Sequence, residues 1–152
     1  MSSLFNNGFL IGALIGGLFG GIGGIALQWA LSKQGSENYP DLLLDVPADA
    51  ENSPAFQAWA RQNGYVLRDG AYTKGRGWLT SATEIRFTDG KMSVQECVNL
   101  LFDKKRFALN APIILGKPVR LAKIKKLNQL LAQWQLPPVR IEPVANKIKR
   151  RS

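Results

Sequence analysis

Residues 8–31 read GFLIGALIGGLFGGIGGIALQWAL, an apolar stretch without a single charged side chain. At 1.5 Å per residue, a helix of this length is about 36 Å long, enough to cross a hydrocarbon core of about 30 Å with some tilt. Trp29 stands near one end, where an amphipathic ring suits the boundary between lipid and water. The stretch therefore predicts a single N-terminal transmembrane helix within residues 1–32.

Glycines recur at every fourth position of this stretch and form two rows along the expected helix. The first row consists of Gly8, Gly12, Gly16, Gly20 and Gly24, and the second of Gly17 and Gly21. Residues four apart share a helix face, so each row predicts a smooth groove that lets a second helix approach closely. This is the pattern of a glycine zipper. Two alternatives remain: a glycine-rich helix that merely faces lipid, and a cleaved signal peptide, although no basic residue precedes the stretch.

Charge is distributed very unevenly along the chain, whose formal net charge is +9. Residues 1–32 carry no charge, residues 37–51 carry five acids and no base, and from Lys104 onward thirteen bases face one acid. Because all bases follow the apolar stretch, the positive-inside tendency predicts a single-pass protein of the cell membrane, with its N-terminus outside and its C-terminal domain cytoplasmic. We expect an acidic linker at 33–52, a basic domain at 53–143 and a basic tail at 144–152.

The soluble part alternates helix and strand signals. Ser53-Pro54 predicts a helix start and Gly64 its end, while Pro118 and Pro137 bound another helix. Ser93-x-x-Glu96 has the form of a capping box and predicts a helix between them. Extended pieces are expected at 65–67, 78–80 and 84–87, and residues 42–46 are either a short strand or a docking segment. The resulting fold class is a single transmembrane helix plus a small α+β domain, with about three helices and a short antiparallel sheet.

Several kinds of chemistry are disfavoured by composition. The chain has no histidine and one cysteine, which excludes an intrachain disulfide and a zinc site of the usual nitrogen and sulfur type. Cys97 falls on the core side of the helix expected after Ser93, so we expect a buried thiol rather than a nucleophile. No set of residues suggests an active site, and we expect neither a metal nor a cofactor.

Two basic regions are candidates for binding anions. Residues 70–78, GAYTKGRGW, interleave glycines with Lys74 and Arg76, as expected of a turn whose backbone N–H groups cradle an anion. The second region is the C-terminal third, and its candidate residues are Arg120, Lys123, Lys125, Lys126, Lys149, Arg150 and Arg151. Between the two anionic partners considered, lipid headgroups are favoured over nucleic acid. The alternatives are a hairpin loop with solvated charges, a solvated face, or a surface for an acidic protein.

These patterns favour a non-enzymatic accessory or assembly subunit that packs through its glycine face against itself or a larger membrane protein. One alternative is a membrane-tethered module that binds nucleic acid or another polyanion. Another is a membrane-active helix that oligomerises.

Overall fold

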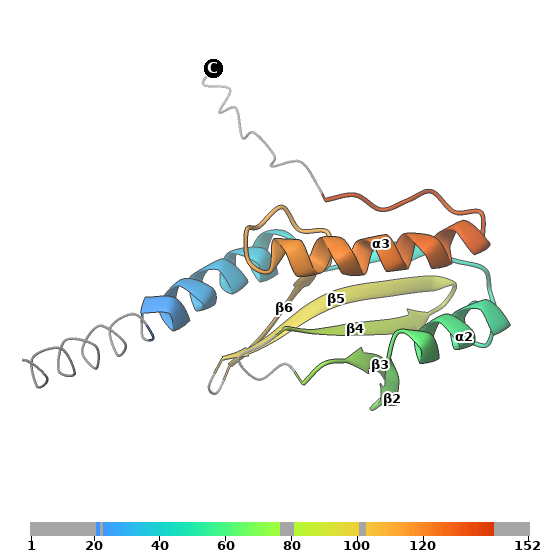
Figure 1. Cartoon of the computed structure of the whole chain (residues 1–152), viewed down its shortest axis with the longest axis horizontal. Helices are drawn as coiled ribbons and strands as arrows, with labels where there is room; N and C mark the ends of the chain where they lie inside the picture. Colours follow the sequence, from blue (N-terminus) through green and yellow to red (C-terminus); the bar gives the residue numbers. More distant parts are fainter. Residues whose placement is uncertain (1–20, 22, 77–80, 101–102, 142–152) are drawn as a thin grey trace, which may run out of the picture.

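The computed structural model describes residues 21, 23–76, 81–100 and 103–141 (Figure 1). An N-terminal helix over residues 23–38 leads into a sheet with two further helices. The elements that follow it are β1 (Leu42–Asp45), α2 (Pro54–Gln62), β2 (Val66–Arg68), β3 (Ala71–Lys74), β4 (Ser81–Thr88), β5 (Lys91–Leu100), β6 (Asp103–Ala108) and α3 (Lys117–Gln133). Three helices and six strands thus make up the described part of the chain.

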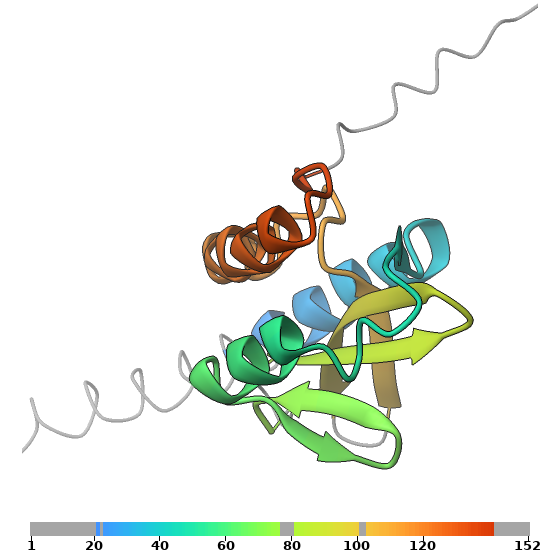
Figure 2. The ribbon, with the colours of Figure 1, turned by 90° about the vertical axis from the view of Figure 1, so that its right-hand side faces the viewer.

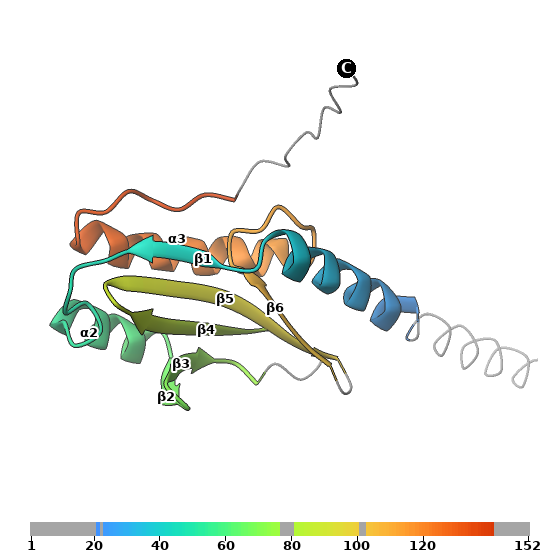
Figure 3. The same cartoon turned by 180° about the vertical axis from the view of Figure 1, so that it is seen from behind.

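All strand pairs of the sheet are antiparallel, in the order β1-β5-β4-β3-β2. Strand β6 also pairs with β5, and it continues the edge along which β1 pairs with the first half of β5 (Figure 3). Asp89-Gly90 closes the β4–β5 hairpin with positive φ at both positions, as type I′ turns require. The long strand β5 therefore pairs with three strands, β1, β4 and β6.

One face of the sheet carries the helices and the core. Figure 2 shows α2 and α3 on the same side of the sheet. Phe56 and Trp59 of α2 and Leu127 and Leu130 of α3 are buried there. The strand residues of the core are Tyr72, Ile85, Met92, Val94, Val98 and Phe107. Because the indole Nε1 of Trp59 also donates to the Lys126 carbonyl at 2.8 Å, the two helices are fixed to each other as well as to the sheet.

The prediction of a single-pass transmembrane helix is wrong for the residues that the structure describes. Among residues 21, 23–76, 81–100 and 103–141, no helix is both long enough and apolar enough to cross a membrane. The helix over residues 23–38 instead packs against the domain. Ile25 joins the core, Trp29 Nε1 donates to Asp103 Oδ2 at 3.4 Å, and Gly35 lies against Phe107.

The glycine zipper likewise has no support in this structure. Gly21 and Gly24 are the members of the two rows that the structure describes, and an added Cβ at either would meet nothing within 4 Å. The other members lie outside the described residues and are Gly8, Gly12, Gly16, Gly17 and Gly20. The close glycine contact of the N-terminal helix is at Gly35, which belongs to neither row. A Cβ there would lie 2.9 Å from Ile113 Cδ1 and 3.1 Å from Phe107 Cγ.

Substituting Gly35 by alanine should therefore destabilise the protein by about 1–3 kcal/mol, because the added Cβ would overpack against Ile113 and Phe107, which are both buried. The matched control is Gly24→Ala in the same helix, which should be neutral or stabilising by up to about 1 kcal/mol because alanine is the better helix former. Denaturant unfolding of both variants measures the difference. Equal effects would show that the helix does not pack against Phe107.

The helix predicted to begin at Ser93 is also wrong, because residues 91–100 form β5. Burial alternates with a period of two over residues 91–96, and Met92, Val94, Glu96 and Val98 are all buried on the helix-covered face. The helices predicted from Ser53 and Pro118 are confirmed as α2 and α3, and Ser53 accepts from the Phe56 N–H as the N-cap. Residues 42–46 contain a strand, β1, and residues 33–38 of the expected linker belong to the N-terminal helix.

Candidate functional site

The segment 70–78 divides into a turn, a strand and a less regular end. Asp69 and Gly70 form the β2–β3 turn with positive φ, and residues 71–74 are strand β3. Gly75 also has positive φ, and a Cβ there would lie 3.0 Å from the Ser81 carbonyl oxygen. Arg76 is exposed, and residues 77–78 lie outside the described part. Lys74 therefore stands on a strand and not in a glycine-rich anion cradle.

The fold brings Lys74 to the basic side of α3. Burial and the neighbouring ammonium groups of Lys126 and Lys123 lower the pKa of Lys74. The Lys74 ammonium also lies 5.9 Å from the centre of the Tyr65 ring. Lys74 therefore lies close to Lys123 and Lys126 of α3, although these residues are far apart in the sequence.

Ion pairing separates the bases of the described chain into two groups. One group pairs with acids and consists of Lys33, Arg86, Lys91, Lys104, Lys105, Arg106 and Lys123. The other group has no acidic partner within the described residues and consists of Arg61, Arg68, Lys74, Arg76, Lys117, Arg120, Lys125, Lys126 and Arg140. We call Lys74, Lys126 and the adjacent Lys125 the lysine surface, and α3 contains no acid. Lys125 and Lys126 are exposed and Lys74 is half-buried, so their charges are available to an anion.

Arg120 does not belong to this surface, although its charge made it a candidate. It is buried at 1% exposure, and its guanidinium donates to four main-chain carbonyls between β6 and α3. The acceptors are Leu109, Ala111, Ile113 and Leu115. Burial lowers the pKa of Arg120, although the Glu96 carboxylate opposes that shift. Arg120 therefore organises the connection into α3 and has no exposed donor surface.

Lys123 also points inward, toward a buried carboxylate on β5. Its ammonium donates to Glu96 Oε1 at 2.8 Å and to Oε2 at 2.9 Å, and the Thr83 hydroxyl donates to Oε1 at 2.6 Å. Glu96 is 0% exposed. The ammonium of Lys123 therefore pairs with Glu96. The sequence predicted Glu96 as part of a capping box, whereas its partner in the structure lies in α3.

The basic tail residues Lys149, Arg150 and Arg151 lie outside the described residues, so the structure does not place them. Cys97 is buried, as expected. Burial and the neighbouring Glu84 carboxylate raise the pKa of the Cys97 thiol to about 12, so it stays protonated near neutral pH.

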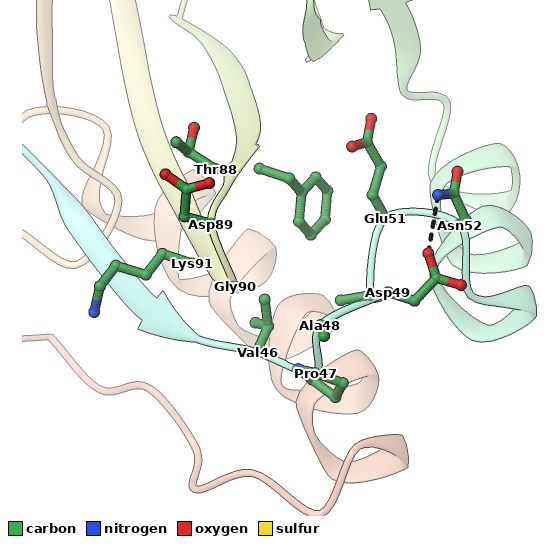
Figure 4. A pocket seen from close by; sticks show the side chains of 12 residues that line it. Val46, Pro47, Ala48, Asp49, Glu51, Asn52, Thr88, Asp89, Gly90 and Lys91 are labelled. Atoms are coloured by element: carbon green, nitrogen blue, oxygen red, sulfur yellow. Dashed lines mark hydrogen bonds between the residues drawn. The ribbon is translucent and has the colours of Figure 1, made fainter.

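A small acidic hollow lies where the β4–β5 turn meets the loop before α2 (Figure 4). Its volume is about 150 Å³, below the range of typical ligand pockets. Asp49, Glu51 and Asp89 line it, but Asp49 accepts from the Asn52 amide at 3.0 Å. Across residues 21, 23–76, 81–100 and 103–141, no group of three or more acidic, cysteine or histidine side chains could hold a metal ion.

No family model matches the chain, and no curated protein or solved structure is detectably similar to it.

Proposed function

We propose that the chain is a non-enzymatic binding module that contacts a phosphodiester polyanion through the lysine surface of Lys74, Lys125 and Lys126. The observation that carries this proposal is the separation of paired from unpaired bases. A positive charge without an acidic neighbour gains the most from an approaching phosphate. The accessory-subunit prediction depended on a membrane-spanning glycine face, so we do not carry it forward.

The chemistry of the surface favours diffuse electrostatic recognition. Lysine ammonium groups act as point charges on flexible stems, whereas arginine would supply a planar fork for reading a particular group. The lowered pKa of Lys74 reflects crowding by Lys123 and Lys126 as well as burial, and a bound phosphate would relieve that repulsion. Nucleic acids and anionic lipids both carry phosphodiesters, so the test has one arm for each.

Binding should weaken about one-hundredfold when Lys74, Lys125 and Lys126 are all replaced by glutamine, because each lysine near an anionic surface contributes about 1 kcal/mol. The measurement uses the full chain in low salt. One arm follows fluorescence anisotropy of labelled single-stranded DNA, and the other follows co-sedimentation with phosphatidylglycerol vesicles against phosphatidylcholine vesicles. The arm that shows binding identifies the source of the phosphodiester.

The matched control replaces Lys33, Lys91 and Lys105 by glutamine, which lowers the net charge equally but removes bases that pair with Glu37, Asp45 and Asp103. We expect the control to bind within about threefold of the unmodified chain, since its bases are already compensated. Equal losses in both variants would mean that only net charge matters. Absence of binding in both arms would also refute the proposal.

A further inference from the structure

The face of the sheet opposite the helices carries a second, independent cluster of charges. Side chains alternate along each strand, so Glu84 and Arg86 of β4 and Ser93 and Gln95 of β5 point away from the core. Arg106 of β6 is opposite Cys97 and shares that side. Figure 2 shows the two labelled helices of Figure 1 on the other side of the sheet. On this side Arg86, Ser93, Gln95 and Arg106 are half-buried, so a ligand can reach them.

Glu84 is the centre of the cluster, and three cations converge on it. Arg86 Nη2 donates to Glu84 Oε2 at 3.0 Å, Arg106 Nε donates to the same oxygen at 3.3 Å, and Lys104 donates to Oε1. The Glu84 side chain is 7% exposed, whereas those of Arg86 and Arg106 are 41% and 39% exposed. One carboxylate thus compensates one of three positive charges.

Burial opposes ionisation of Glu84, but the hydrogen bond and charge of Lys104 and the charge of Arg106 outweigh burial and hold the pKa of that carboxyl below its usual value. The carboxylate is therefore ionised at neutral pH and holds both guanidinium groups in place. Each guanidinium has five N–H donors, of which Glu84 engages one in each arginine. The other N–H groups of the two arginines are held in place, and Glu84 leaves two of the three positive charges uncompensated. This arrangement favours an anion that presents two adjacent oxygens to the guanidinium groups.

A depression of about 650 Å³ lies beside these arginines, within the size range of small-molecule sites. Its described lining comes from strands and adjoining turns, with no residue from a helix. Ser93 and Gln95 line it but are already oriented, because they donate to Asp41 Oδ1 and to the Pro40 carbonyl at 2.8 Å each. Leu43, 57% exposed, adds an apolar contact. The other ionic lining residues are Asp41, Asp89 and Lys91, and Lys91 pairs with Asp45.

We propose that this depression binds a small molecule carrying a carboxylate or a phosphate, held by the guanidinium groups of Arg86 and Arg106. Glu84 acts as the positioning residue for both arginines. Asp41 and Asp89 also line the depression, and their negative charges would repel a second anionic group on the ligand. The ligand therefore presents its anionic end to the arginine pair. The site is separate from the lysine surface, which belongs to β3 and α3.

Calorimetric titration of the full chain with inorganic phosphate, and separately with the monocarboxylate butyrate, tests the proposal and distinguishes the two chemistries. At least one of the two should bind saturably. Arg106→Lys keeps the charge beside Glu84 but loses the fork, and we expect about tenfold weaker binding. The double variant Arg86→Gln/Arg106→Gln should lose binding. Thermal melting of Arg106→Lys checks that the domain remains folded.

The matched control is Arg61→Gln/Arg68→Gln, which removes two exposed arginines of α2 and β2 and should leave the affinity unchanged. The lysine-surface triple variant should also bind the small anion normally, so this proposal and the polyanion proposal can fail independently. Absence of saturable binding, or binding that survives in the Arg86→Gln/Arg106→Gln variant, would overturn the inference. Loss of binding in the lysine-surface variant would likewise overturn it.

Discussion

Replacing Lys123 by methionine should lower the free energy of unfolding by about 3–5 kcal/mol. Glu96 is completely buried, and Lys123 donates to both of its oxygens, so the variant leaves a buried carboxylate with Thr83 as its remaining described donor. A loss of this size is a large share of the 5–15 kcal/mol that typical domains possess. Denaturant unfolding at neutral pH measures it.

Lys125→Met is the matched control, because Lys125 is an exposed neighbour in the same helix with no acidic partner in the described chain. We expect this control to change stability by less than about 0.5 kcal/mol. The double variant Glu96→Met/Lys123→Met should recover part of the loss, since an apolar pair removes the stranded charge. If Lys123→Met costs no more than Lys125→Met, the buried ion pair does not hold α3 on the sheet.

Arg120→Met should destabilise the protein by about 4 kcal/mol. Four carbonyls lose a charged donor, and a buried polar group left unpaired costs about 1–3 kcal/mol, with partial relaxation of the chain reducing the sum. Methionine keeps much of the volume, so the loss reports hydrogen bonding more than packing. Denaturant unfolding gives the free energy, and amide hydrogen exchange over residues 109–117 reports local opening.

Arg120→Lys separates the structural role of this residue from an electrostatic one. Lysine keeps the positive charge but lacks the planar fork that reaches several carbonyls together, so we expect a loss of about 2 kcal/mol or more. An exposed anion-binding arginine would tolerate the same change. Unchanged stability in Arg120→Lys would contradict the arrangement described for the β6–α3 connection.

The sequence predicted α2 and α3 correctly, because the signals for these two helices act between residues that are close in the sequence. Ser53-Pro54 starts α2 through a cap contact with Phe56, three residues away, and Pro118 marks the first turn of α3. The predictions failed where the decisive partner is distant. The buried positions of β5 include Glu96, and an acid among apolar residues hid the strand period and imitated a capping box. Its partner Lys123 lies 27 residues further along the chain.

The sequence predicted only part of the candidate site, because other residues of the site meet partners that are distant in the sequence. Composition and position identified Lys74, Lys125 and Lys126 as bases near a turn and on a helix, but charge alone could not separate them from Arg120 and Lys123, which bind buried acceptors. The arginine pair around Glu84 went unnoticed, since its members come from β4 and β6 and meet only across β5. Within the apolar stretch, hydropathy did not predict that residues 23–31 belong to a helix that packs against the domain, because hydropathy does not distinguish lipid from protein as the partner of a helix.

The salt dependence of polyanion binding tests the central claim most directly. Each lysine that contacts a phosphate contributes about 0.7–0.9 to the slope of log affinity against log salt concentration. The full chain should show a steep negative slope with the polyanion that it binds, single-stranded DNA or phosphatidylglycerol vesicles. Replacing Lys74, Lys125 and Lys126 by glutamine should reduce that slope by about two units, whereas the Lys33, Lys91 and Lys105 control should keep it. Equal slopes in all three proteins would contradict a binding role for the lysine surface.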